Sequence, residues 1–293
     1  MHLQDSTLGV FTPFDSLDST EQKLVVKTWA VAEKAYVPRS NFPVGAVVLA
    51  QNANGQTGVF EGCNVENRFF SPTICAERNA ITTAVAYGFT KILKIALVCK
   101  NYQGPGSSPC GLCRQVIVEF GSQADILGLA DTNHNVRKFV GAELLPAAQG
   151  APIVLTSATS KEKRFAKKLR ELLPTSYVPY SKKPQAAIFV ATNGNGAPRH
   201  FPGVPDDNAS YGGSAPAECV AMRTAKTKGY TRNVTLAVTV DDLNAVNPVE
   251  GESLQVLREF GKDATILLVD ENALVRTSIV ELLPDSFGPE SLH

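Results

Sequence analysis

The chain has 293 residues, which fits one large domain or two ordinary ones, and 44% of them are hydrophobic. Basic and acidic residues each number 28, so the formal net charge is zero and a broad nucleic-acid-binding surface is not expected. No apolar run reaches the roughly 18 residues of a membrane-spanning segment, so we expect no membrane partner.

The cysteines bear on the cellular compartment and on metal binding. Residues 1–18 lack the basic start and apolar block of a secretory signal. Closely spaced cysteines in an intracellular chain are more often metal ligands than disulfide partners. We therefore expect a reducing, cytoplasmic location. Three cysteines have no comparable partners and are interpreted as ordinary buried or partly buried thiols: Cys63, Cys99 and Cys219.

The predicted elements of the first half alternate between helices and strands. We expect, in chain order, an amphipathic helix capped by Ser19 or Thr20, a β-rich run at 44–49 and a hairpin turn at Asn54-Gly55. These are followed by a helix over 76–87 that a glycine ends, a buried strand at 92–99 and a helix over 113–120. Such alternation predicts an α/β layered fold.

The same series returns in the second half. Tyr36-Val37-Pro38 reappears as Tyr177-Val178-Pro179, and Ala76-Glu77 as Ala217-Glu218, both at an offset of 141 residues. The repeat indicates duplication of one domain of about 130 residues. The expected second set is a helix from Ser160, a strand at 187–191, a turn at Asn195-Gly196, a helix over 218–228, a strand at 235–240 and a helix over 254–260.

Two short motifs of the first half predict a metal site. One is Cys75-Ala76-Glu77, and the other runs from Pro109 through Cys110 to Cys113. A Cys-x-x-Cys pair presents two sulfurs from one turn, and Cys75 supplies a third. Three protein ligands leave one tetrahedral position for water, as in catalytic rather than structural zinc sites. Cys75 and Cys110 both fall where a helix should begin, which favours thiolate.

Two neighbouring side chains complete this prediction. Three thiolates leave zinc with excess negative charge, and Arg78 is placed to hydrogen-bond the sulfurs and draw off that charge. Glu77 is not needed as a ligand, and a carboxylate beside the water is a natural general acid and base. A Cys-x-x-Cys motif alone is as often structural, but the two motifs together match the signature of zinc-dependent nucleobase deaminases.

The sequence resembles the cytidine deaminase family over about residues 25 to 146. The resemblance is carried by four segments in order: Asn41 to Ala46, Gly62 to Asn67, Cys75 to Arg78, and Pro109 to Gln115. It implies a three-layer α/β/α cytidine-deaminase-like fold with a mixed sheet, here duplicated as two tandem domains. The Cys-Ala-Glu-Arg form resembles the short homotetrameric branch, and the two-copy length resembles the homodimeric branch.

The resemblance also implies substrate-binding residues. Asn64 and Glu66 would bind the ribose hydroxyls, and Phe42 would pack on the pyrimidine ring. The backbone of Ala76 would read the base edge together with Glu77, while Gln115 would lie behind the metal ligands with Arg78. Without the resemblance, the alternatives for Asn64 and Glu66 are a surface turn or a local ion pair, and Phe42 would be a core aromatic.

The implied activity is hydrolytic deamination of cytidine and 2′-deoxycytidine to uridine and 2′-deoxyuridine in pyrimidine salvage. Glu77 would move protons between the attacking water, N3 of cytosine and the departing amine. Glu66 would repel a nearby phosphate, which favours a free nucleoside. The alternatives are another cytosine-nucleoside or polynucleotide deaminase, and a non-catalytic zinc-stabilised binding protein.

The second copy lacks the metal ligands. Cys75 falls on Pro216, and Cys110 and Cys113 fall near Glu250 and Ser253. We therefore expect one zinc ion per chain, and a homodimer that imitates a tetramer of single domains. The predicted division is an arm at 1–19, a catalytic zinc deaminase domain at 20–149, a linker at 150–160 and a degenerate non-catalytic domain at 161–293.

The end of the second copy resembles the C-terminus of the short enzymes. There, after Leu283-Pro284, Phe287 occupies the place of a phenylalanine that reaches a neighbouring active site. We hypothesise that Phe287 stacks near the base, in trans in the pocket of the other subunit. Packing of Phe287 at a domain interface is the alternative.

Overall fold

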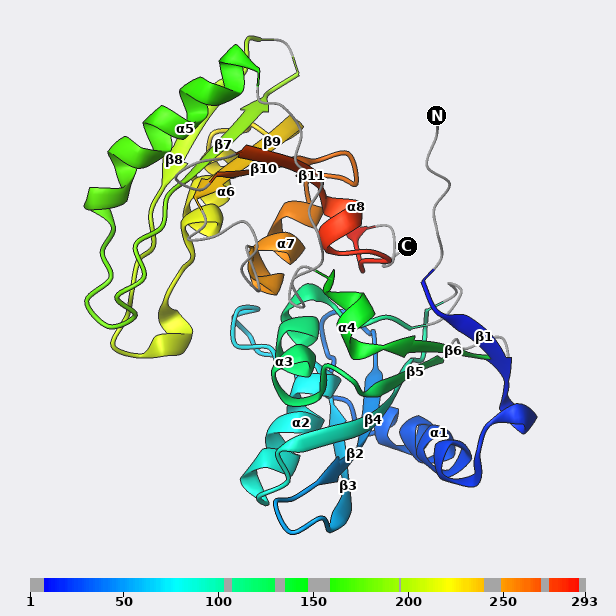
Figure 1. The fold of residues 1–293 in the computed structure, drawn as a ribbon. Coiled ribbons are helices and arrows are strands. Elements are labelled where there is room, and N and C mark those ends of the chain that lie inside the picture. The colour runs from blue at the N-terminus through cyan, green and yellow to red at the C-terminus, as the bar shows by residue number, and fades with distance from the viewer. Residues whose placement is uncertain are drawn as a thin grey trace. The chain divides into compact units, whose positions relative to one another are not determined.

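The computed structural model describes residues 8–102, 107–129, 135–146, 159–194, 196–239, 249–269 and 274–289. The chain forms two compact units (Figure 1). The first comprises Met1–Leu145 together with Asp285–His293, and the second comprises Pro146–Pro284. The tail after Pro284 thus belongs with the first unit, whereas the sequence-based division assigned it to the second. No helix in the described part of the chain is long and apolar enough to cross a membrane.

The first unit is built on a six-stranded mixed sheet in the order β1-β6-β5-β4-β2-β3. Its strands are β1 (Val10–Pro13), β2 (Val44–Gln51), β3 (Thr57–Cys63), β4 (Lys91–Cys99), β5 (Asp125–Leu129) and β6 (Asn135–Val140). Its helices are α1 (Ser19–Ala32), α2 (Ala76–Ala86), α3 (Gly111–Gly121) and α4 (Gly141–Leu144). β4 and β5 run parallel, and the other neighbours run antiparallel.

Alternating side chains divide the first unit into three layers. Ala46, Val48 and Ala50 pack with residues of α2 and α3, whereas Val47 packs with residues of α1 on the opposite face. Successive residues of a strand point to opposite faces, so one apolar strand serves two cores. Figure 1 shows α1 on one side of this sheet and α2 and α3 on the other.

The start of α1 differs from the prediction. Asp18, not Ser19 or Thr20, is the N-cap, because its carboxylate accepts from the Glu21 N–H at 2.7 Å while the Glu21 side chain accepts from the Asp18 N–H. This reciprocal pair satisfies two backbone donors at once, and Asp18 is the residue that has a glutamate, Glu21, three positions later. The hairpin turn at Asn54-Gly55 is confirmed, with Gly55 at a φ of 80°.

The second unit repeats this architecture around a five-stranded sheet in the order β11-β10-β9-β7-β8. Its strands are β7 (Ala187–Thr192), β8 (Arg199–Gly203), β9 (Arg232–Thr239), β10 (Thr265–Val269) and β11 (Leu274–Ser278). Its helices are α5 (Ser160–Leu172), α6 (Ala217–Thr227), α7 (Gly251–Arg258) and α8 (Ile279–Leu282). The central pair β9 and β10 is again parallel, and only β1 has no counterpart among the described strands.

The predicted α/β fold with a mixed sheet, duplicated along the chain, is therefore confirmed. Most of the predicted linker at 150–160 and residue Asn195 of the second predicted turn lie outside the described residues. α5 begins at Ser160 as predicted, with Thr159 as its N-cap and Glu162 as the reciprocal partner.

Candidate active site

Three cysteines of the first unit meet at the N-termini of two helices. Cys75 is the N-cap of α2, and Cys110 is the N-cap of α3. Their sulfurs are 3.8 Å apart, and the sulfur of Cys110 is 3.5 Å from that of Cys113. Tetrahedral zinc with Zn–S bonds of about 2.3 Å places its sulfurs roughly 3.8 Å apart, so this set fits zinc. It is the one such cluster found among the described residues.

The helix termini favour a thiolate in this cluster. Free N–H groups and the positive end of the helix dipole favour negative charge at an N-cap. Hydrogen bonds with Cys113 and Cys75 lower the pKa of Cys110 well below that of an ordinary thiol. The same hydrogen bonds raise the pKa of Cys75 to about 11 and that of Cys113 well above the ordinary value, so Cys110 is the thiol that ionises first. A close packing contact fixes α2: a side chain added at Gly62 of β3 would lie 2.2 Å from the Ala80 nitrogen. Glycine at this position therefore sets how closely Cys75 approaches the sheet.

Arg78 lies beside the sulfur of Cys75. Its Nη2 donates to the Thr73 carbonyl at 3.1 Å and lies 3.9 Å from the Cys75 sulfur. Its Nε is buried without a hydrogen-bond partner. The guanidinium is therefore held at the edge of the thiolate cluster, where it offsets negative charge.

Glu77 is buried next to this cluster, with 4% of its surface exposed. Burial, together with the charge of Cys75, raises the pKa of Glu77 to about 7. A carboxyl that holds a proton near neutrality is suited to accept one and return it.

Asn64 and Glu66 make hydrogen bonds that the sequence did not predict. The Asn64 side chain donates to the Phe42 carbonyl at 2.9 Å and accepts from the Val44 N–H at 2.8 Å. The Glu66 carboxylate accepts from the N–H groups of Arg39 and Ser40. Both residues thus hold the segment that carries Phe42. The contacts to ribose remain predictions.

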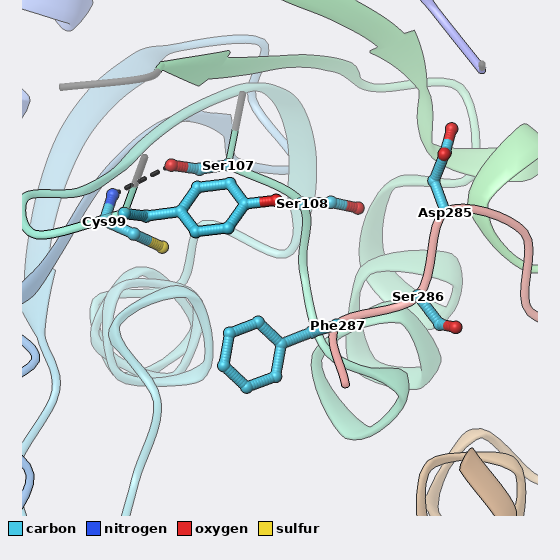
Figure 2. A pocket seen from close by; sticks show the side chains of 7 residues that line it. Cys99, Ser107, Ser108, Asp285, Ser286 and Phe287 are labelled. Carbon is cyan, nitrogen blue, oxygen red and sulfur yellow. Dashed lines mark hydrogen bonds between the residues drawn. The ribbon is translucent and has the colours of Figure 1, made fainter. Parts of the chain in front are cut away.

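The first unit contains a small pocket (Figure 2). Its wall comes from two parts of the first unit, and it is lined by Cys99, Tyr102, Ser107, Ser108, Asp285, Ser286 and Phe287. Burial, together with the charges of Glu77, Cys75 and Cys110, raises the pKa of Cys99 to about 12. The ring of Phe287 lies 5.9 Å from that of Phe42, centroid to centroid. The pocket therefore shares Phe287 with the contact to Phe42, and its Ser108 lies two residues before Cys110 in the chain.

Known proteins resemble this chain in the same region. The family model for the cytidine and deoxycytidylate deaminase zinc-binding region matches residues 18–129. A cytidine deaminase of Sporosarcina psychrophila is 40% identical over 127 residues, covering 43% of this chain and 89% of that protein. The cytidine deaminase of Mycoplasma genitalium is 40% identical over 115 residues, covering 39% and 84%.

The chain belongs to the cytidine deaminase family. A crystal structure of the Burkholderia pseudomallei cytidine deaminase is 34% identical, covers 44% of this chain and 98% of that chain, and has a TM-score of 0.38. The matched family region is zinc-binding, and the sulfurs of Cys75, Cys110 and Cys113 fit zinc.

The remaining predicted residues of this deaminase domain occupy the helix starts. Ala76 is the first residue of α2 and is fully buried, and its N–H has no carbonyl partner within the helix. Gln115 is half-buried in α3. Their roles toward base and ligands, and entry of Phe287 into a partner subunit, remain predictions. The Phe287 that contacts Phe42 here belongs to the same chain.

Sequence reasoning missed a buried arginine of this cytidine deaminase domain. Arg114, directly after Cys113, is fully buried and donates to the carbonyls of Pro109 and Leu144 at 2.8 and 2.6 Å. Arg114 lies within the segment from Pro109 to Gln115, but its acceptors are up to 171 residues away in the sequence. No local sequence pattern therefore identifies these acceptors.

Proposed function

We propose that this chain hydrolyses cytidine and 2′-deoxycytidine to uridine and 2′-deoxyuridine, with release of ammonia. The observation that carries the proposal is the buried Glu77 carboxyl beside three sulfurs that fit zinc. Three protein ligands leave a position for water, as in catalytic zinc sites.

Zinc held by Cys75, Cys110 and Cys113 supplies Lewis acidity that makes water nucleophilic near neutral pH. Glu77 accepts a proton from the attacking water and delivers it to N3 of the cytosine ring. It then helps to protonate the amine that leaves C4. One water is consumed and one ammonia released, so the step balances.

The substrate is held by groups of the first unit. Asn64 and Glu66 bind the ribose hydroxyls, the backbone of Ala76 reads the base edge, and Phe42 packs on the ring. Phe287 of the same chain lies against Phe42 and closes the pocket from the side of the tail. The negative charge of Glu66 disfavours a phosphorylated sugar, since like charges repel.

The loss of ultraviolet absorbance on deamination tests the substrate. Cytidine, cytidine monophosphate and a cytosine-containing oligonucleotide are compared at equal concentration. Turnover of cytidine with little or none of the other two is expected. Preference for the oligonucleotide would favour a polynucleotide deaminase, and no turnover by zinc-loaded protein would favour a binding protein.

Glu77→Gln tests the proton shuttle. We expect kcat to fall by about a thousandfold, since general acid–base catalysis contributes 10²–10⁴-fold, while one zinc per chain is retained. Glu171→Gln, an exposed site on α5, is the control. Near-wild-type turnover by Glu77→Gln would remove Glu77 from the mechanism.

We further propose that the chain forms a homodimer in the cytoplasm and serves pyrimidine salvage, with the second unit in an architectural role. Both units expose large aromatics at equivalent positions: Tyr36 at 60%, Phe70 at 71%, Tyr177 at 58% and Tyr211 at 76%. Exposed apolar groups of this size favour burial against another chain. Light scattering should give twice the chain mass, and a monomer at micromolar concentration would contradict the dimer.

A further inference from the structure

The tail after Pro284 is fixed at its first residue. The Asp285 carboxylate accepts from the Leu8 N–H at 2.6 Å and forms an ion pair with Arg137. The Asp285 backbone carbonyl accepts from Nη2 of Arg114 at 2.9 Å. Three donors from separate parts of the first unit therefore hold one residue.

The buried environment of Arg137 favours its ion pair with Asp285. Its side chain is 3% exposed, and its guanidinium lies over the rings of Phe139 and Phe11 at 4.9 and 5.7 Å. A buried cation in apolar surroundings is stabilised by a directly bonded carboxylate. Asp285 is the one carboxylate with an ion pair to Arg137 among the described residues.

Arg114 links the tail to the loop that precedes the metal ligand Cys110. The same Nη2 that bonds Asp285 also donates to the Ser108 hydroxyl at 2.9 Å, and Nε donates to the Pro109 carbonyl. The guanidinium fork has a fixed planar geometry, so its acceptors are held in a fixed arrangement. The tail and the cysteine loop are therefore positioned by one buried side chain.

The backbone at Asp285 directs the tail. Its φ is 47°, in the left-handed region that aspartate and asparagine tolerate better than other residues with a side chain. Figure 2 shows that the Asp285 carboxylate and the Phe287 ring leave the tail in different directions, with the ring on the pocket side. The turn at Asp285 thus lets one short segment bind Arg137 and still present Phe287 to Phe42.

We propose that Asp285 is a positioning residue that sets the place of Phe287 in the nucleoside pocket by binding Arg137, the Leu8 N–H and Arg114. The end of the chain therefore completes the pocket of its own first unit, and Asp285 determines how tightly nucleoside binds. This inference rests on the proposed cytidine deaminase activity and on Phe287 as a pocket residue.

Asp285→Asn tests the inference, because asparagine keeps the size and the left-handed backbone but removes the charge. We expect KM for cytidine to rise about tenfold, the effect of losing a charge-assisted hydrogen bond, with kcat within about twofold of wild type. Zinc content should not change. Hydrogen–deuterium exchange of a peptide that includes residues 285–289 should become faster.

Asp125→Asn is the matched control. Asp125 pairs with Lys94 at 2.6 Å at the starts of β5 and β4, whereas Cys99 of the pocket ends β4. The control removes the same charge from the same unit, and its KM and tail exchange should equal those of wild type.

Phe287→Ala tests whether Asp285 acts through Phe287. Asp285→Asn should raise KM little further in the Phe287→Ala background, since the group it positions is gone. If Asp285→Asn unfolds below the assay temperature, Arg137→Lys, which keeps a cation, should give a smaller rise in KM and faster tail exchange.

Unchanged KM and unchanged tail exchange in Asp285→Asn would overturn the inference. If Asp285→Asn raised KM by the same factor in wild type and in the Phe287→Ala background, that result would overturn the inference as well. A shift of KM by Phe287→Ala without any shift by Asp285→Asn would do so while leaving the proposed function intact. Wild-type protein that leaves cytidine unchanged would instead overturn the proposed function, and the exchange measurement would still decide whether Asp285 anchors the tail.

Discussion

The two units share a scaffold but differ in chemistry. Their helices and strands follow the same order, and each central strand pair is parallel. Cys75, Cys110 and Cys113 of the first unit are replaced by Pro216, Glu250 and Ser253 in the second. Pro216 and Glu250 are still the N-caps of α6 and α7. The fold therefore retains both helix starts without needing the metal.

A hydrogen-bonding pattern shared by the two units distinguishes a structural role of Glu66 from a role in substrate binding. In the second unit, Asp207 accepts from the N–H groups of Tyr180 and Ser181, as Glu66 does from Arg39 and Ser40. Each turn then passes through a left-handed residue, Lys182 or Asn41. Because a unit without the cysteine triad keeps this bond, capping the turn belongs to the scaffold, and a role of Glu66 toward ribose would be an addition to it.

Substitutions at Cys113 and at its counterpart Ser253 should give the largest difference in zinc content and turnover. Cys113→Ser is expected to lose zinc and turnover, because loss of a ligand exceeds the roughly 10- to 100-fold effect of losing a group behind the ligands. Ser253→Cys should leave one zinc per chain, since Pro216 offers no donor. Elemental analysis and cytidine turnover check both variants. A second zinc in Ser253→Cys would show that the second unit still forms a metal site.

The buried Glu218 should give the next largest effect, a pH dependence of the free energy of unfolding. Glu218 of α6 is 1% exposed, with one carboxyl oxygen unpartnered. Burial, together with the charge of Glu250, raises its pKa from 4.5 to about 7, although hydrogen bonds from Gln185 and Ser253 act in the opposite direction. The folded unit therefore holds this proton more tightly than the unfolded chain does. Its free energy of unfolding should fall by about 3 kcal/mol as pH rises from about 4.5 to above 7.

Glu218→Gln should remove that fall, because the amide does not ionise. Denaturant unfolding at pH 5 and pH 8 measures it, and the variant should exceed wild type by about 2 to 3 kcal/mol at pH 8 only. The exposed-site variant Glu171→Gln should keep the wild-type pH dependence. Equal slopes in wild type and Glu218→Gln would show that Glu218 keeps an ordinary affinity for its proton.

The helix caps should give the smallest and most similar effects. Asp18 caps α1 and Thr159 caps α5, each with a reciprocal glutamate three residues on. Asp18→Ala and Thr159→Ala should each lower the free energy of unfolding by about 1 kcal/mol. Thermal and denaturant unfolding check this, with no change in KM. A large loss of turnover in either variant would mean that the scaffold and the site are not separable.

The features that could be predicted from the sequence are those whose residues lie close together in the chain. The cysteine triad, Glu77 and Arg78 lie within two compact motifs, and the duplicated element order follows from hydrophobic periodicity. The strands β1, β5, β6, β10 and β11 were not predicted, and neither was the cap at Asp18, which directly precedes the expected caps Ser19 and Thr20. Hydrogen bonds from Arg114 and Arg137 to Asp285 span 171 and 148 residues, and no local pattern encodes such pairs.

The central claim is that only the first unit binds zinc and carries the activity. The most direct test measures the zinc content of the purified chain together with cytidine turnover while a chelator removes the metal. We predict one zinc per chain, with turnover falling in proportion to the zinc removed. Two zinc ions per chain, or turnover that persists in zinc-free protein, would contradict the account.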